Sequence, residues 1–261
     1  MTRLCGGCGR RVALVGGIPD FFEGDEEELD RPNRSWLGEE AVAAREIVYE
    51  LSHRELVGMA FCMAEVGKRS FAGCRILEVA AGTGHFTRWL REVCVAGTEI
   101  YAFDVSWPIL ARARAKVGEA EGVHLFRGNA RGRLPFLQNY FDMIVVRLAP
   151  FGQRDVPKIV AAHRLLKRGG WYFGAGWQKR QWETSPVAWA LAKGYDEAAF
   201  HEWGYWRDVS AEEGEALIVE RRQMVASGFE QLADWDEGEA LRPRQVVHEH
   251  LLMARKGGGD E

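Results

Sequence analysis

The spacing of hydrophobic residues along the chain changes near Gly73. Between Trp36 and Val66 the apolar positions recur every three or four residues, which predicts one or two amphipathic helices. Beyond Gly73, short apolar runs alternate with segments of helical period. This pattern predicts strands at 75–80, 99–103, 123–127, 142–147 and 170–175, and helices at 84–94, 107–117 and 155–167.

Strands that alternate with helices of about ten residues are typical of parallel βαβ units joined by right-handed crossovers. After the fifth strand we expect an aromatic, partly helical insertion at about 177–210, followed by a helix from Glu212 to Ala226. Two last strands, near 229–235 and at 245–254, close the domain. The sequence therefore predicts an α/β fold with a doubly wound, mostly parallel sheet.

The two ends of the chain differ from this domain in composition. Residues 1–35 form a leader rich in cysteine and glycine, whose acidic run at 25–28 is expected to be a solvated turn. The domain itself is expected to span 36–255, and the glycine-rich tail 256–261 to be disordered. Five cysteines, an odd number in an ordinary globular composition, favour reduced thiols over a disulfide framework.

Overall composition narrows the function classes. With 261 residues, of which 47% are hydrophobic, the chain is long enough for one large domain with a substantial core. We see no apolar run of membrane-spanning length and no secretory signal, so we expect a cytoplasmic protein. The net charge of −4 weakens the case for nucleic-acid binding, which usually leaves a basic footprint on a domain.

Polar and small residues gather where the predicted parallel strands end. In an open parallel sheet a ligand binds beyond these carboxyl ends. The first strand carries Glu78 and leads into a turn of small residues, which lets the backbone approach a ligand closely. The candidate ligand-binding residues at the four strand ends are Glu78, Ala80, Gly82, Gly84, Asp104, Val105, Asn129, Ala130 and Arg147.

Together these strand ends predict a cleft shaped for adenosine. Asp104, twenty residues after Gly84, is placed to accept hydrogen bonds from the vicinal hydroxyls of a ribose. The Asn129 amide and the Ala130 backbone N–H can read the edge of an adenine. A dinucleotide fingerprint would instead need glycine at Thr87, where the diphosphate lies against the helix, and usually carries no acid inside the first strand.

Four ordered motifs between residues 75 and 175 resemble those of the class I S-adenosylmethionine-dependent methyltransferases, in their UbiE-like form. The stretch ILEVAAGTGHFT resembles the first motif of that family, and FDVSWPILARARAK the second. GNARGRLPFLQNYFDMIVV and HRLLKRGGWYFGA resemble the third and fourth. The resemblance implies a Rossmann-like sheet of seven strands with the last strand antiparallel, S-adenosylmethionine as cofactor and S-adenosylhomocysteine as product.

The resemblance also implies roles for single residues. Glu78 is placed near the methionine end of the cofactor, where its carboxylate can accept a hydrogen bond from the amino group, while Asp104 holds the ribose. Asn129 replaces the commoner aspartate beside the adenine and still offers an acceptor. Ala80 replaces a glycine, which binding tolerates if the backbone there has a negative φ. Asp142 is structural in the family's pattern.

Several of these residues also have a structural interpretation. Glu78 could pair with a neighbouring arginine, and Asp104 could cap the helix that contains Pro108. His85 could act as a base, but a histidine that opens a helix is more often a packing or surface residue. No catalytic residue is assigned, since none stands out among the reachable bases, which are His85, Tyr195, His201 and Tyr205.

The leader contains the pair Cys5 and Cys8, half of a zinc ribbon, and resembles the zinc-knuckle leader found before some methyltransferase domains. A structural zinc site needs four ligands, and no second cysteine pair or nearby histidine pair follows. We therefore favour a metal-free remnant and assign no metal site. A bound zinc ion would need its other ligands from elsewhere, such as a partner subunit.

The resemblance implies a methyltransferase, and the sequence leaves its acceptor open. The aromatic stretch at 177–210, with Trp203 and Tyr205, would suit a flat or apolar acceptor, so a small-molecule metabolite methylated on an O, N or C atom is the leading hypothesis. An rRNA or tRNA methyltransferase is an alternative that the leader favours and the net charge disfavours. A non-catalytic cofactor-binding scaffold subunit is a second alternative, and the sequence predicts no oligomeric state.

Overall fold

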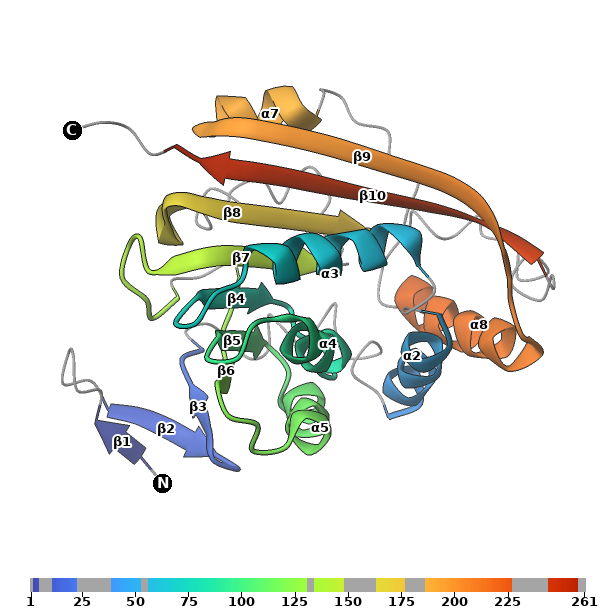
Figure 1. Ribbon diagram of the computed structural model, residues 1–261. Coiled ribbons are helices and arrows are strands. Elements are labelled where there is room, and N and C mark those ends of the chain that lie inside the picture. The colour runs from blue at the N-terminus through green and yellow to red at the C-terminus, as the bar shows by residue number, and fades with distance from the viewer. Residues whose placement is uncertain are drawn as a thin grey trace.

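The computed structural model of the chain describes residues 2–4, 11–22, 39–52, 56–130, 134–147, 163–176, 186–226 and 244–257. Within these ranges ten strands form one sheet, in the order β1-β2-β3-β6-β5-β4-β7-β8-β10-β9 (Figure 1). Several expectations concern residues outside the described ranges, among them the Cys5/Cys8 pair, the acidic run at 25–28, the strand near 229–235 and the end of the tail from residue 258.

The centre of the sheet is parallel, as the sequence predicts. Its strands are β4 (Arg75–Val79), β5 (Glu99–Asp104), β6 (Val123–Arg127), β7 (Phe141–Arg147) and β8 (Leu166–Gly176). Neighbouring strands in the order β6-β5-β4-β7-β8 pair in parallel. The crossover helices are α4 (His85–Val93) and α5 (Trp107–Val117), and α3 (Val57–Arg69) precedes β4. Of the predicted helix at 155–167, only 163–165 lie in a described helical segment.

Alternating side chains of the central strands build a core on each face of the sheet. Ile76 packs with Met63 of α3 and Phe86 of α4 on one face. Leu77, the next residue, points to the opposite face, where Ala190 of α7 (Pro186–Ala192) packs. Helices on both faces make the sheet doubly wound, which confirms the predicted fold class. No helix in the described part of the chain is long and apolar enough to cross a bilayer.

The two closing strands differ from the prediction. β9 (Tyr195–Asp208) forms the edge of the sheet, and β10 (Arg244–Lys256) runs antiparallel to both β8 and β9. The antiparallel last strand is confirmed, but residues expected as an aromatic, partly helical insertion instead form α7 and then a long strand. The reason is that aromatic side chains pack well on a pleated surface, and this stretch pairs with β10 along its whole length.

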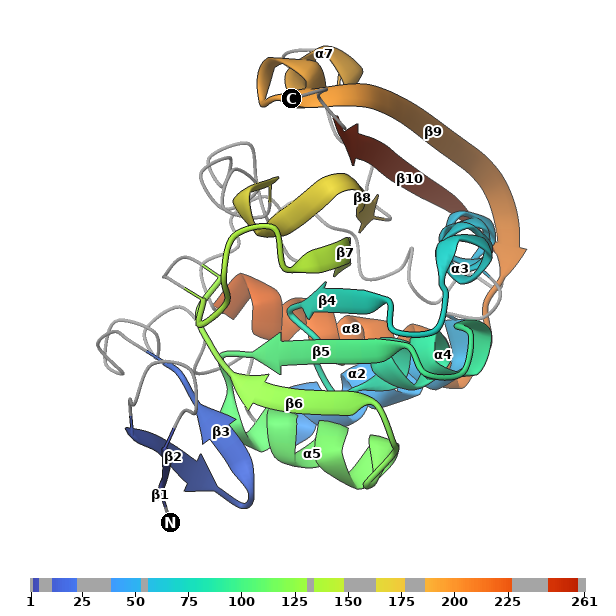
Figure 2. The same cartoon turned by 60° about the vertical axis from the view of Figure 1, so that its left-hand side comes forward.

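The leader extends the sheet at its other edge (Figure 2). β1 (Thr2–Leu4), β2 (Arg11–Val15) and β3 (Ile18–Asp20) form an antiparallel meander. β3 pairs in parallel with β6, opposite Arg127, and the Phe21 N–H donates to the Arg127 carbonyl at 2.9 Å. The seven strands β4 to β10 are therefore joined by three strands of the leader, which pairs with the sheet through β3 and β6.

A pair of helices lies beyond the carboxyl ends of the parallel strands. α2 (Glu39–Ser52) packs on α8 (Ala211–Ala226) through Ala44, Val48 and Ala216. β9 runs in the direction of β8, so α8 begins at the carboxyl edge of the sheet, as Figure 1 shows. Arg207, near the end of β9, holds α8 through its Nη1, 2.7 Å from the Glu213 carboxylate. We call α2 and α8 the helical cover.

Candidate functional site

The turn between β4 and α4 is built on three residues with positive φ. Gly84, at φ +83°, lies so close to α5 that a Cβ there would be 3.0 Å from the Cα of Ala113, so this glycine serves helix packing. Gly82, at φ +58°, has no atom within 4 Å of the place where a Cβ would lie. Gly82 therefore borders open space, as expected of a residue beside a ligand.

The condition under which binding would tolerate Ala80, a negative φ, is not met. Ala80 has a φ of +59°, in the left-handed region that favours glycine. An L-residue with a Cβ costs about 1 kcal/mol or more in this conformation. The chain accepts the strain because the turn must carry β4 towards β5, and the Ala81 N–H then donates to the Phe103 carbonyl at 2.9 Å.

Asp104 joins the first two predicted strand ends. Its Oδ2 accepts a hydrogen bond from the Gly82 N–H at 3.0 Å, and its Oδ1 accepts from the Val105 and Ser106 N–H groups at 2.7 and 3.1 Å. These amides precede α5, which begins at Trp107 without a side-chain cap, so Asp104 is not the helix cap. The carboxylate instead fixes the loop after β5 against the glycine turn.

Glu78 lies in the centre of the same edge. It belongs to β4, pairs in register with Ala102 and Val145 on the flanking strands, and is 1% exposed. As its neighbours Leu77 and Val79 face the α7 side, Glu78 faces the side of α3 and α4. A carboxylate in this position lies in a low-dielectric setting, where a positively charged ligand group is favoured.

The third and fourth strand ends are adjacent to the first two. The Gly128 N–H donates to the Asp104 carbonyl at 3.1 Å, so Asn129 and Ala130, both partly exposed, follow directly beside Asp104. Arg147 ends β7 opposite Ala175 of β8, and its side chain lies outside the described part of the chain. The strand order β6-β5-β4-β7 thus brings the four predicted ends to one edge.

A buried ion cluster next to the turn was not visible in the sequence. His85, the first residue of α4, has its Nε2 3.0 Å from Glu46 Oε2 of α2, and Lys116 of α5 contacts both side chains. Burial raises the pKa of Glu46, but hydrogen bonds from His85 and Lys116 outweigh it and lower this pKa to about 2. Burial lowers the pKa of Lys116. The three residues come from three helices, and no sequence spacing could have paired them.

Two of the other candidate bases lie on β9, which β7, β8 and β10 separate from β4 and its glycine turn. Tyr195 begins β9 at the opposite edge of the sheet, and burial raises the pKa of its hydroxyl. His201 stacks on Trp203, with ring centroids 5.9 Å apart, and faces Phe61 of α3. The side chain of Tyr205 lies outside the described residues. Among the four candidates, His85 is the one whose described position adjoins the turn.

Trp203, which the sequence suggests for an acceptor, packs against α3. Its ring lies 2.8 Å from where a Cβ on Gly58 would be, and 5.6 Å from the ring of Phe61, so it seals α3 against β9. The next strand supplies Glu249, whose carboxylate accepts the Gly58 and Met59 N–H groups at 2.8 and 3.0 Å. These contacts close the amino end of α3, whose own cap residue makes no side-chain hydrogen bond.

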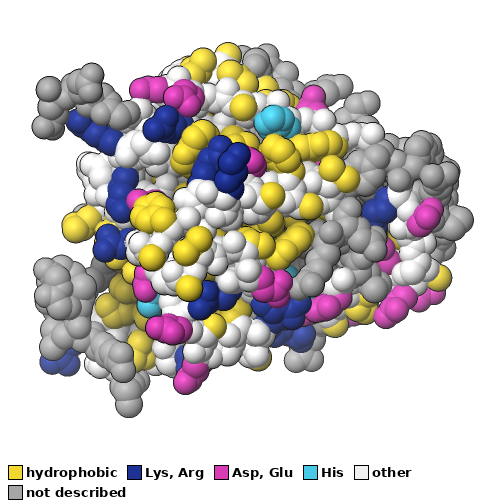
Figure 3. All heavy atoms as spheres, in the orientation of Figure 1, with side chains coloured by type: hydrophobic (Ala, Val, Ile, Leu, Met, Phe, Trp, Pro, Cys, Tyr) yellow, Lys and Arg dark blue, Asp and Glu magenta, His cyan; other side chains and the backbone are white. Residues whose placement is uncertain are grey.

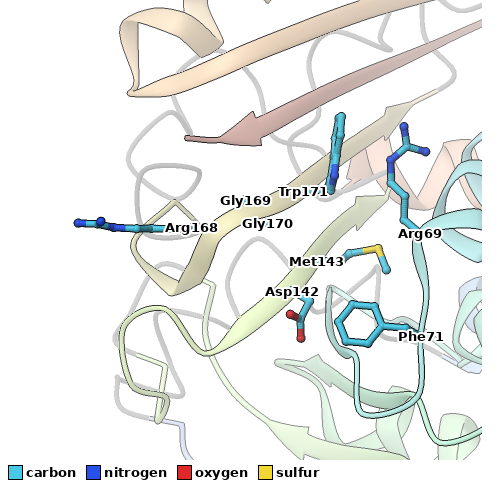
Figure 4. A pocket seen from close by; sticks show the side chains of 8 residues that line it. All are labelled: Arg69, Phe71, Asp142, Met143, Arg168, Gly169, Gly170 and Trp171. Atoms are coloured by element: carbon cyan, nitrogen blue, oxygen red, sulfur yellow. The ribbon is translucent and has the colours of Figure 1, made fainter. Parts of the chain in front are cut away.

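The opposite edge of the sheet carries a cavity of about 230 Å³. Figure 4 shows Asp142, Met143 and Trp171 along its wall, with Arg168 pointing away from it. Asp142 accepts hydrogen bonds from the Arg75 N–H at 2.9 Å and from Lys167 Nζ at 2.8 Å. The prediction that Asp142 bridges structural elements is confirmed, and this cavity is separate from the predicted strand ends.

The described cysteines show no sign of metal or disulfide chemistry. Cys62, Cys74 and Cys94 are buried and form no disulfide, and burial raises the pKa of Cys74 to about 12 and that of Cys94 to about 11. Within the ranges that the structure covers, no group of three or more His, Cys, Asp or Glu side chains could hold a metal ion.

Comparisons with known proteins identify the type of domain. Residues 76–170 match the model of a methyltransferase domain family. The chain is 31% identical over 157 residues to the ubiquinone/menaquinone biosynthesis C-methyltransferase UbiE of Erwinia tasmaniensis. The aligned region covers 55% of this chain and 59% of that protein. It is 34% identical over 112 residues to a demethylmenaquinone methyltransferase of Staphylococcus aureus, with 41% of this chain and 44% of that protein covered. The chain thus spans about half the length of these relatives.

Solved structures share the fold at low identity. Phosphoethanolamine N-methyltransferase 2 of Haemonchus contortus superposes with a TM-score of 0.57 at 17% identity, over 92% of this chain and 62% of that one. The YcgJ protein of Bacillus subtilis superposes with a TM-score of 0.54 at 16% identity, over 77% of this chain and all of that one, 100%. The family match begins after the leader, so the resemblance of the leader to a zinc knuckle gains no support. Residues 76–170 therefore match a methyltransferase domain, and the sheet has the fold of class I S-adenosylmethionine-dependent methyltransferases.

Proposed function

We propose that the protein transfers a methyl group from S-adenosylmethionine to an O, N or C atom of a small-molecule metabolite. One observation carries the proposal: the Asp104 carboxylate accepts a hydrogen bond at 3.0 Å from the N–H of Gly82, the glycine that borders open space. In this proposal the acid that binds the ribose and the turn that the cofactor approaches form one unit at the carboxyl edge of the sheet.

The residues at this edge fit the cofactor. S-adenosylmethionine offers a ribose, an adenine, an amino group and a sulfonium, and no diphosphate. Asp104 and Asn129 carry acceptors for the ribose hydroxyls and the adenine amino group, on neighbouring strands. Glu78, 1% exposed, supplies negative charge in the centre of the edge for the positively charged amino acid end.

The chemistry asks mainly for alignment. The sulfonium supplies an activated methyl group, so the protein contributes proximity, in-line orientation and exclusion of water. Asp104 and Asn129 fix the nucleoside, and the helical cover lies over the edge at which the acceptor would enter. A general base is needed only where the acceptor keeps its proton at neutral pH. His85 adjoins the turn, held by Glu46 and Lys116, and is our candidate for that role.

Two observations favour a small acceptor over RNA. The relatives named above are enzymes of quinone biosynthesis and of phosphoethanolamine methylation, and their names support a metabolite as acceptor. On the face in Figure 3, Lys and Arg are interspersed with Asp and Glu, and no basic stripe of the kind that tracks a phosphate backbone is seen there. A net charge of −4 agrees with this pattern.

Titration calorimetry with S-adenosylhomocysteine tests the cofactor. We expect saturable binding with one site per chain. No heat of binding at millimolar ligand would overturn the proposal, because the family's cofactor would then have no site here.

A transfer experiment tests the acceptor. The protein is incubated with S-adenosylmethionine labelled in the methyl group and with either a metabolite extract or total RNA. We expect label in the metabolite fraction. Label in RNA alone would replace our acceptor class by the RNA alternative, and cofactor binding with label in neither fraction would favour a scaffold subunit.

A further inference from the structure

Arg127, the last residue of β6, is a buried cation next to the cofactor loop. It is 4% exposed, and its Nε–H donates to the Val105 carbonyl at 2.8 Å. Val105 directly follows Asp104, which lies opposite Arg127 in the β5–β6 register. One side of this loop is therefore held by the Asp104 carboxylate, and the other by the Arg127 guanidinium.

The leader supplies the surroundings that this cation needs. Asp20 Oδ2 lies 3.6 Å from Arg127 Nη1, and the ring of Phe22 lies 4.5 Å from the guanidinium carbon. The ring of Trp107, the first residue of α5, lies 5.1 Å from the same carbon. Ion pairing and two aromatic faces offset the cost of removing a guanidinium from water.

Backbone contacts set the leader in register with this cluster. The Phe21 N–H donates to the Arg127 carbonyl at 2.9 Å, and Asp20 Oδ1 accepts from the Phe22 N–H at 3.0 Å, which orders the short segment after β3. Phe21 also packs edge-on against Phe126, with ring centroids 5.9 Å apart. The segment 20–22 thus presents its carboxylate and its ring to one partner, Arg127.

We propose that the leader is part of the cofactor site: Asp20 and Phe22 position Arg127, and Arg127 positions the Asp104–Ser106 loop that receives the ribose. The inference rests on the proposed function, since it gives this loop a ligand. Arg127 is a positioning residue, acting through the Val105 carbonyl, and the leader residues act through Arg127.

The test measures the dissociation constant of S-adenosylhomocysteine by calorimetry on the full chain. Phe22→Ala should weaken binding about tenfold because it removes a cation–π contact with Arg127. Arg127→Lys should weaken binding by a similar factor because it removes the hydrogen bond to the Val105 carbonyl. Phe22→Tyr keeps the aromatic face and should restore the wild-type constant. In turnover assays the KM for S-adenosylmethionine should rise, with the acceptor KM and kcat unchanged.

Arg114→Ala is the matched control. Arg114 Nη1 donates to the Gly16 carbonyl at 2.7 Å, so this variant also loosens the leader, but at a turn that does not touch Val105. It should leave the dissociation constant unchanged. Asp20→Asn is the milder variant that decides the matter if Phe22→Ala does not fold, and its melting temperature is recorded alongside.

The outcomes separate the two proposals. Wild-type protein that does not bind S-adenosylhomocysteine contradicts the proposed function itself. If the wild-type protein binds and the folded Phe22→Ala and Arg127→Lys variants bind equally well, the positioning role is overturned while the proposed function stands. Equal weakening in Arg114→Ala and Phe22→Ala would also overturn it, because the leader would then act through general stability.

Discussion

Two aspartates at opposite edges of the same sheet have contrasting surroundings. Asp142, near the start of β7, binds the ammonium of Lys167 and one backbone amide, and so closes the junction of three segments. Asp104, at the end of β5, accepts hydrogen bonds from amides of two loops beside a glycine that borders open space. The difference teaches that a carboxylate neutralised by a neighbouring lysine serves stability, whereas one set among backbone amides at the carboxyl edge is suited to a ligand.

The largest effect is expected at the carboxyl edge. Asp104→Asn keeps one acceptor oxygen but places an NH2 group against the backbone amide that the other oxygen accepted, and it removes the charge that strengthens hydrogen bonds from ribose hydroxyls. We expect S-adenosylhomocysteine to bind about 100-fold more weakly, which corresponds to roughly 2.7 kcal/mol, together with a lower melting temperature. Calorimetry and thermal unfolding of the same samples measure both quantities. Unchanged affinity would remove the distinction between the two aspartates.

The ion cluster of the carboxyl edge should make stability depend on pH. The pKa of Glu46 is about 2 in the folded protein against 4.5 in the unfolded chain, so its contribution is complete above pH 4.5 and is lost as the pH falls towards 2. We expect about 2 kcal/mol of unfolding free energy to disappear across this window, allowing for partial exposure.

Urea unfolding at several pH values measures this loss. Glu46→Gln should reduce stability at pH 6 and flatten the part of the pH profile that is due to this residue. A profile equally steep in wild type and variant would mean that other carboxylates cause the acid sensitivity.

The amino edge should respond in stability alone. Asp142→Ala removes a charge-assisted bond to the Arg75 amide and the pair with Lys167, and we expect a loss of about 1.5 kcal/mol in unfolding free energy. The dissociation constant of S-adenosylhomocysteine should stay at the wild-type value. Weakened binding in a fully folded variant would show that the two edges are coupled, contrary to the comparison.

The smallest effect is expected at Ala80. Ala80→Gly relieves the left-handed strain at φ +59° and adds freedom to the unfolded chain, so the net gain should be about 0.5 kcal/mol. Chemical denaturation of the two proteins under identical conditions can resolve this difference. A loss of stability instead would mean that the methyl group makes contacts that outweigh the strain.

The parts of the fold that the sequence predicts are those set by local patterns. The strands β4 to β8 follow from short apolar runs, and Glu78, Asp104 and Asn129 lie at one edge of the sheet because parallel strands end there. Pairings between distant segments carry no local signal. The register of β9 with β10, and of β3 with β6, could not be predicted for that reason.

The same limit applies to the site. The sequence leaves Tyr195 among the reachable bases because it does not reveal the direction of β9, and hence the distance of Tyr195 from the carboxyl edge. The sign of φ at Ala80 depends on how the turn crosses to β5, which the residue type does not reveal. Arg127 lies in a strand whose apolar pattern gave no reason to single it out, and its partners come from the leader.

The join between β9 and β10 has a consequence for how such a protein can diversify. Asp208 and Arg244 lie opposite each other in the ladder, so the chain leaves the sheet for α8 and returns to it at the same level. The ladder therefore fixes only the two ends of the intervening segment, so variants of this chain could differ in the length of that segment while β9 and β10 keep their register.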